Sequence, residues 1–165
     1  MALPTSIRNS QRGRFQTAPV ETSLYGSFRE IFTQPDSSMN SWMNILLVFL
    51  GGGCGSVGRW GISLWLKRYA ATLWGLPVHT LCANMLGCFI IGLLTGWLSR
   101  NSHADLSLLL VTGFCGGFTT FSTFSLESFE MLRSGQTGLA LVYVALSLVI
   151  CVGAVAGGVA VMNCK

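Results

Sequence analysis

Four long apolar stretches, separated by short polar segments, make up most of the chain after residue 42. They run from 44 to 66, from 79 to 98, from 106 to 132 and from 138 to 162. Each has roughly the 20 residues that an α-helix needs to cross about 30 Å of hydrocarbon. The pattern therefore predicts an all-α membrane protein with four transmembrane helices embedded in membrane lipid.

The first 42 residues differ in composition from the rest of the chain. They are rich in Ser, Thr, Gln, Arg and Pro, and they contain no apolar core of a secretory signal. We predict a disordered N-terminal extension over 1–42 and a four-helix domain over 43–165. Two alternatives remain: an upstream start assigned wrongly, with translation beginning at Met43, or an amphipathic targeting segment built on the arginines of the extension.

Composition and charge support a membrane protein and exclude several other classes. The chain is 51% hydrophobic and 10% charged, with a mean hydropathy of +0.58, whereas soluble domains carry about a quarter charged residues. Four of the ten basic residues lie in the extension and the others are scattered, so we expect no nucleic-acid partner. The six cysteines form no Cys-x-x-Cys pair, and no nucleophile–base pair is visible. We therefore expect neither an enzyme nor a cysteine metal site.

The basic residues near the ends of the apolar stretches are distributed evenly between the two sides of the membrane. Arg29, Arg100 and Lys165 lie on one side, and Lys67, Arg68 and Arg133 lie on the other. Because an excess of Lys and Arg marks the cytoplasmic side, an even count allows insertion in both orientations. We therefore predict a dual-topology protein whose two copies pack as an antiparallel homodimer. The alternatives are a single orientation set by the extension, or a paralogue that provides the opposite-facing subunit.

The segment from Gly113 to Glu127, with the sequence GFCGGFTTFSTFSLE, departs from the pattern of an ordinary membrane helix. Its hydroxyl residues, Thr119, Thr120, Ser122 and Thr123, interleave with Phe118, Phe121 and Phe124. The adjacent glycines Gly116 and Gly117 loosen the backbone. Irregular backbone at membrane depth is tolerated only where it is buried in protein or lines a water-filled path. We therefore predict a break in the third helix and a path for a small ion.

Two kinds of ion contact are possible in this segment. Phe121 and Phe124 are three residues apart and share a helix face, where ring edges would attract an anion and ring faces a cation. Membrane core aromatics are the alternative interpretation. Carbonyl groups freed between Gly116 and Thr119 would coordinate a monovalent cation, which two chains could share on a dimer axis.

Polar residues in the other stretches add candidates, each with a structural alternative. Asn84 offers an amide donor to an anion, or it bridges two helices. Arg59 gives an entrance vestibule a positive potential, or it reaches the lipid interface. Tyr143, Ser147 and Cys151 recur every four residues and form one stripe, which lines a path or makes interhelical hydrogen bonds.

These motifs together resemble the CrcB/Fluc family of bacterial fluoride channels over about residues 43–162. Four segments match in order, namely 51–59, 77–89, 113–127 and 143–147. The resemblance implies an antiparallel homodimer with two pores in the cell inner membrane, through which cytoplasmic fluoride leaves passively. It also implies a central sodium ion held by backbone carbonyls.

The resemblance assigns roles to individual positions of this chain. It implies a fluoride pore lined by Asn84, Phe121, Ser122, Thr123, Phe124, Tyr143 and Ser147, and sodium ligands at the carbonyls of Gly116 and Thr119. Two positions depart from the family pattern. His79 stands where glycine is common, and Cys151 stands where a hydroxyl residue is common.

Two other classes of membrane protein are alternatives to an ion channel. A small multidrug antiporter also has four spans and dual topology, but it needs an ionisable carboxylate in the membrane. The first two apolar stretches contain no Asp or Glu, and only Glu127 and Glu130 lie near the end of the third. A membrane scaffold would explain the glycines and Asn84 but not the hydroxyl–phenyl segment.

Overall fold

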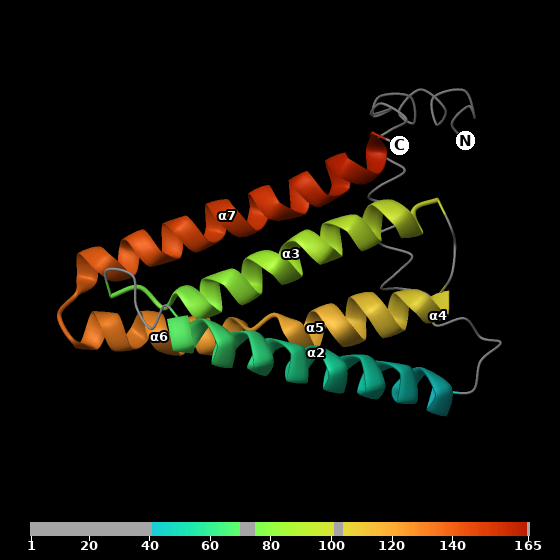
Figure 1. Cartoon of the computed structure of the whole chain (residues 1–165), viewed down its shortest axis with the longest axis horizontal. Helices are drawn as coiled ribbons and strands as arrows, with labels where there is room; N and C mark the ends of the chain where they lie inside the picture. The colour runs from blue at the N-terminus through green and yellow to red at the C-terminus, as the bar shows by residue number, and fades with distance from the viewer. Residues whose placement is uncertain (1–40, 70–74, 101–103, 165) are drawn as a thin grey trace, which may run out of the picture.

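The computed structural model describes residues 41–69, 75–100 and 104–164, and all of its regular elements are helices (Figure 1). They are α2 (Ser41–Tyr69), α3 (Val78–Leu98), α4 (Ala104–Ser107), the π-helix η1 (Leu108–Cys115), α5 (Gly116–Phe118), α6 (Phe121–Arg133) and α7 (Thr137–Asn163). The helices α4, η1, α5 and α6 follow one another within one span.

Four stretches are long and apolar enough to cross a membrane, as the sequence pattern predicts. They cover Ser41–Leu66, Val78–Leu98, Asp105–Arg133 and Thr137–Asn163. The first begins two residues before the predicted domain boundary at residue 43, a difference within the usual scatter of helix ends. The predicted extension otherwise lies outside the described residues, as do Arg29 and Lys165 of the charge count.

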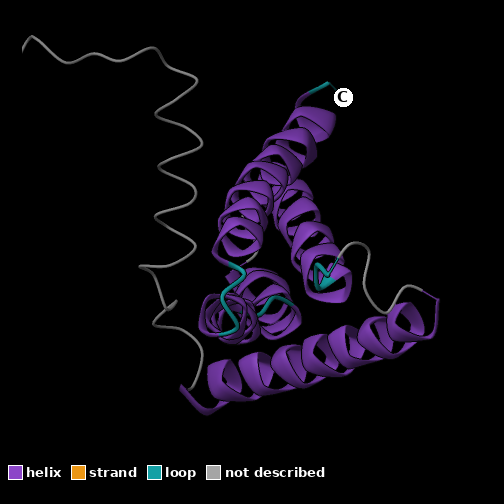
Figure 2. Cartoon of the chain, turned by 90° about the vertical axis from the view of Figure 1, so that its left-hand side faces the viewer, coloured by secondary structure: helices purple, strands orange, loops and turns teal. Residues whose placement is uncertain are grey.

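The helices pack as two pairs, visible in both cartoon views. Helix α3 runs along α7, and α2 packs against η1 and α5 (Figure 1), with α2 lying across the other helices in the view of Figure 2. Glycines allow the close approach in the second pair. A Cβ atom added to Gly51 or Gly55 would collide with the backbone carbonyls of Leu109 and Phe114. Glycine at these two positions therefore permits close packing of the two helices.

A similar glycine contact joins α3 and α7, and it provides a test of this packing. A Cβ atom on Gly158 would meet the backbone of Phe89, Gly92 and Leu93 on α3. We expect Gly158→Ala to lower the free energy of unfolding by about 1–3 kcal/mol, because the helices must separate. Thermal unfolding in detergent measures this loss.

A matched control lies on the same helix. Gly138, the second residue of α7, has no atom within 4 Å of an added Cβ, so Gly138→Ala is expected to leave the unfolding temperature nearly unchanged. Equal losses in the two variants would contradict the packing explanation, since helix propensity alone favours alanine at both positions.

The third span changes backbone conformation near its middle. Helix α5 ends at Phe118, and α6 begins at Phe121. Between them, Thr119 and Thr120 have extended dihedral angles, with φ of −83° and −142° and ψ of 152° and 107°. We call these two residues the linker. The side chain of Thr120 caps α6 by accepting a hydrogen bond from the backbone N–H of Thr123 at 3.4 Å.

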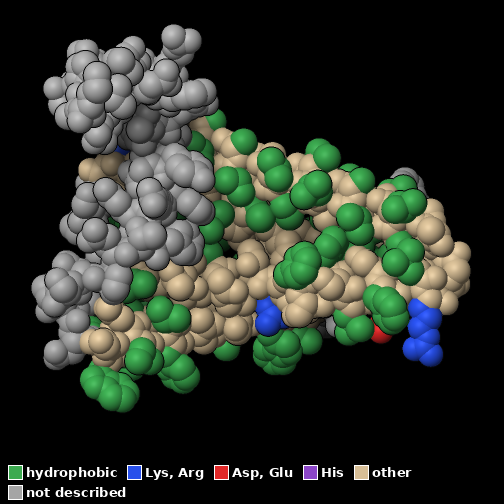
Figure 3. Space-filling view, turned by 180° about the vertical axis from the view of Figure 1, so that it is seen from behind, with side chains coloured by type: hydrophobic (Ala, Val, Ile, Leu, Met, Phe, Trp, Pro, Cys, Tyr) green, Lys and Arg blue, Asp and Glu red, His purple; other side chains and the backbone are tan. Residues whose placement is uncertain are grey.

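The chain has a small core and a largely apolar surface. Tyr143, Ala140 and Met131 form a buried cluster where α6 and α7 meet, and Phe124 packs against it. Many large apolar side chains are exposed, and Figure 3 shows them along the helices with few charged groups among them. An apolar surface of this extent is suited to contact with lipid or with another subunit.

Candidate functional site

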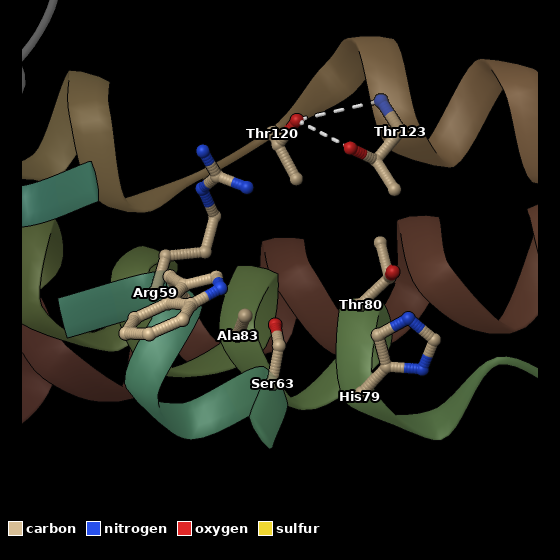
Figure 4. Close-up of a pocket in the computed structure, with 8 residues that line it drawn as sticks. Arg59, Ser63, His79, Thr80, Ala83, Thr120 and Thr123 are labelled. Atoms are coloured by element: carbon tan, nitrogen blue, oxygen red, sulfur yellow. Dashed lines mark hydrogen bonds between the residues drawn. The ribbon is translucent and has the colours of Figure 1, made fainter. Parts of the chain in front are cut away.

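A cavity of about 180 Å³ lies between α2, α3 and the start of α6. It is lined by Arg59, Trp60, Ser63, His79, Thr80, Ala83, Thr120 and Thr123. Figure 4 shows Thr120 and Thr123 on one side of this cavity and Arg59, Thr80 and His79 on the other. Of the residues predicted from the sequence, Arg59 and Thr123 therefore belong to its lining.

Arg59 approaches the third span next to the linker. Its Nε donates a hydrogen bond to the Gly117 carbonyl at 3.3 Å, and Ser56 Oγ donates to the same carbonyl at 3.4 Å. The guanidinium group is partly buried at the cavity wall. One positive charge therefore lies beside the cavity and within a few residues of the linker.

Asn84 holds the backbone of the linker from α3. Its Oδ1 accepts a hydrogen bond from the Thr120 N–H at 2.8 Å, and its Nδ2 donates to the Thr120 carbonyl at 3.3 Å. The side chain thus satisfies both backbone groups of an extended residue, as a neighbouring β-strand would. The interhelical bridge considered for Asn84 is present, and the second Nδ2 hydrogen remains for another acceptor.

The hydrogen bonds of the linker release two carbonyl groups from their usual helical donors. In a continuous helix the Gly116 carbonyl would accept from the Thr120 N–H, which here donates to Asn84 instead. The Thr119 carbonyl would accept from the Thr123 N–H, which donates to the Thr120 hydroxyl. Gly116 is exposed on the single chain. Neutral carbonyl oxygens of this kind suit a hard monovalent cation.

Three aromatic rings form a row on α6 and α7. The centroids of Phe121 and Phe124 lie 5.8 Å apart at an interplanar angle of 43°, which confirms their predicted shared face. Phe124 lies 5.2 Å from Tyr143 at 46°. These separations and tilts lie within the range of favourable aromatic pairs, between stacked and edge-to-face geometry. Phe121 is 80% exposed, so its ring faces away from the rest of its own chain.

Glu127 connects α3, α6 and α7. Its Oε1 accepts a hydrogen bond from Thr80 Oγ1 at 2.7 Å, and its Oε2 accepts from Tyr143 Oη at 2.9 Å. His79 Nε2 lies 3.4 Å from Oε1. The sequence pattern placed Glu127 only near the end of the third apolar stretch, without these partners, and Thr80 was not among the predicted site residues.

A signal for this group was present in the sequence. Thr80 lies four residues before Asn84, and Glu127 lies three residues after Phe124. Each therefore shares a helix face with a predicted site residue.

The remaining predicted residues lie away from the cavity. Ser147, one turn beyond Tyr143, is buried, and its Oγ has no hydrogen-bond partner among the described residues. Ser122 Oγ lies 3.2 Å from Thr120 Oγ1 at the exposed surface. The cavity lining contains neither Phe121, Phe124 nor Tyr143. This cavity of the single chain therefore does not gather the predicted pore residues around it.

The fold and the site define a class of protein. Four apolar helices surround polar groups that concentrate at one linker in the third span. This combination is that of a multi-pass membrane protein with an irregular segment partly buried between its helices.

Comparison with known proteins identifies the family. A family model described as "CrcB-like protein, Camphor Resistance (CrcB)" matches residues 46–159. Proteins named "Fluoride-specific ion channel FluC" from Salmonella arizonae and Salmonella newport are 47% identical over 106 residues, which cover 63% of this chain and 81% of each relative. The chain belongs to the CrcB family, and the resemblance found in the sequence is confirmed. These relatives are named as ion channels and not as enzymes.

Proposed function

We propose that this protein is a fluoride-selective ion channel that lets cytoplasmic fluoride leave the cell passively and so reduces its toxicity. The structural observation that carries the proposal is the row of tilted rings, Phe121, Phe124 and Tyr143, beside the linker. Ring edges attract an anion without binding it so tightly that conduction stops. The relatives named as fluoride channels supply the identity of the anion.

The proposed route begins at the cavity and continues along the rings. Arg59 draws anions into the cavity as a vestibule. The pore beyond it combines ring edges with polar donors, namely Asn84 Nδ2 and the hydroxyl groups of Ser122, Thr123, Tyr143 and Ser147. Hydroxyl and amide donors replace the water that a small anion loses on entry. The unpartnered hydroxyl of buried Ser147 is available for this task.

A second, antiparallel copy of the chain completes each pore. Phe121 is 80% exposed, so a pore that uses its ring needs a wall from another subunit. Two-fold symmetry then gives two equivalent pores per dimer. The even distribution of basic residues supports two opposite orientations in the cell inner membrane.

Passive conduction would allow the protein to remove fluoride from the cell without an energy source. Fluoride enters a cell as neutral HF, dissociates at cytoplasmic pH and is trapped as the ion. A channel in the membrane releases the trapped anion down its gradient. A drug antiporter is disfavoured, because both oxygens of the mostly buried Glu127 already accept hydrogen bonds from Thr80 and Tyr143.

The direct test is fluoride release from liposomes that contain the purified full-length chain, followed with a fluoride electrode. We expect rapid release of fluoride and no release of chloride from matched liposomes. Well-folded dimers that release no fluoride, or that release both anions equally, would contradict a selective channel. Fluoride release that requires a proton gradient would favour an antiporter instead.

The free carbonyls of Gly116 and Thr119 fit a structural sodium ion at the dimer interface. Both have lost their helical donors, and Gly116 is open on the surface of the single chain. A bound sodium ion would supply a positive charge between the two subunits, and these carbonyls would hold it by their dipoles.

Removal of sodium tests this assignment. We expect dimers purified with N-methylglucamine in place of sodium to unfold at a lower temperature, because carbonyl dipoles of two subunits then face one another without a cation. Readdition of sodium is expected to restore the unfolding temperature, whereas added N-methylglucamine is not. Equal unfolding temperatures in the two cations would overturn the sodium site and leave the channel proposal standing.

A further inference from the structure

A second basic side chain faces the cavity beside Arg59. His79, the second residue of α3, lines the cavity, and its Nε2 lies 3.4 Å from Oε1 of Glu127. Both partners are mostly buried, with 17% of the His79 side chain and 15% of the Glu127 side chain exposed. In the sequence this histidine was only a departure from the family pattern. In the structure it is part of the cavity wall.

We propose that His79 makes anion flux through this protein depend on pH, with faster flux when the imidazole is protonated. The inference rests on the proposed channel function. Histidine is the side chain that ordinarily changes charge between about pH 5 and 8. A change of charge at His79 therefore alters the electrostatic potential of the cavity within the physiological range of pH.

The charges around the cavity give the sign of the effect. From the contacts of the described residues, the titratable and charged groups around this pair are Glu127 on α6, Arg59 on α2 and Tyr143 on α7, which donates to Glu127. With neutral His79, the positive charge of Arg59 is opposed by the negative charge of Glu127. Protonation of His79 adds one positive charge, so the cavity becomes net positive and concentrates anions.

The hydrogen bonds of Glu127 also explain why His79 affects the charge of the cavity but is not needed for folding. Thr80 Oγ1 and Tyr143 Oη donate to the two oxygens of Glu127 and hold the carboxylate in position. Removal of the imidazole therefore leaves Glu127 bonded to two other helices. A neutral replacement of His79 is expected to fold normally and to lose only the response to pH.

The test measures fluoride release from liposomes of the full-length chain, with equal pH on both sides and a potassium ionophore to dissipate the membrane potential. Release from protein-free liposomes is subtracted at each pH, because neutral HF crosses lipid. Between about pH 8 and pH 5.5 we expect the wild-type rate to rise about two- to fivefold, as one added charge near the anion path implies.

Three variants of His79 separate the effect of side-chain charge on flux from the effect of side-chain size. His79→Gln and His79→Gly are expected to give a flat profile at the wild-type rate of high pH, because neither side chain gains a proton. His79→Lys is expected to give a flat profile near the wild-type rate of low pH, because its charge persists. Size-exclusion profiles and unfolding temperatures check that each variant folds.

Two outcomes would overturn the inference while leaving the channel proposal intact, and a third would overturn both. A flat wild-type profile, or a glutamine variant with the wild-type response to pH, would remove the role of His79 while fluoride release persists. No protein-dependent release at any pH would overturn the proposed function and this inference with it.

Discussion

Replacement of both Phe121 and Phe124 with isoleucine is expected to reduce fluoride release by about 100-fold or more, to the level of protein-free liposomes. Isoleucine preserves an apolar side chain but removes the positive ring edge that attracts the anion. Phe121 is 80% exposed on the single chain, so its replacement removes little packing beyond its ring contact with Phe124. Phe124 loses a ring contact with Tyr143, which costs about 0.5–1.5 kcal/mol. The liposome flux assay measures the result.

A matched control on the same helix separates the ring-edge effect from a general effect of losing phenyl groups. Phe129 lies on α6 and is 60% exposed, but it makes no ring contact with Phe121 or Phe124. We expect Phe129→Ile to retain fluoride release near the wild-type rate. Wild-type release from the Phe121/Phe124 double variant would refute the ring-edge mechanism. A double variant that dimerises normally but conducts no fluoride would also exclude the membrane-scaffold alternative.

Replacement of Asn84 with alanine is expected to lower both the unfolding temperature and the rate of fluoride release. The variant loses the hydrogen bonds to the N–H and the carbonyl of Thr120. An unpaired backbone group in a buried site costs about 1–3 kcal/mol, and both groups lie in the middle of the third span. Thermal unfolding in detergent and liposome flux measure the two losses.

Replacement of Asn84 with aspartate separates the structural role of Asn84 from its role in conduction. Asn84→Asp keeps an acceptor for the Thr120 N–H but removes the donor and adds a charge that repels anions. We expect it to unfold at a higher temperature than the alanine variant while conducting as little fluoride. Leu86→Ala, on the exposed side of α3, serves as the control that keeps flux. An alanine variant as stable as wild type would refute the role of Asn84 in holding the linker.

Much of the fold followed from hydropathy alone. Four apolar stretches of sufficient length led directly to four spans, because a chain in hydrocarbon must satisfy its backbone within helices. The four-residue spacing of Gly51 and Gly55 is likewise typical of a close helix contact, and the carbonyls of Leu109 and Phe114 lie against these two glycines. The partner helix could not be predicted, because spacing identifies a face of a helix but not what it packs against.

The site was less predictable, because its contacts join residues distant in sequence. Phe121 and Phe124 are neighbours on one helix, so their contact could be read from spacing. Asn84 was recognised as polar at membrane depth, but its pairing with both backbone groups of Thr120 spans 36 positions. Glu127 and Thr80 are 47 positions apart, and no local pattern links them.

Because Phe121 is exposed on the single chain, the membrane is expected to stay impermeable to ions while newly made subunits are still unpaired. On the proposed assembly, a newly inserted chain carries the ring on its outer surface and has no opposite wall, so it offers no route for ions. In that proposed assembly, conduction would begin only when an inverted copy arrives. A cell can therefore accumulate unpaired subunits of either orientation without any leak, and permeability rises with the square of their density while pairing is incomplete.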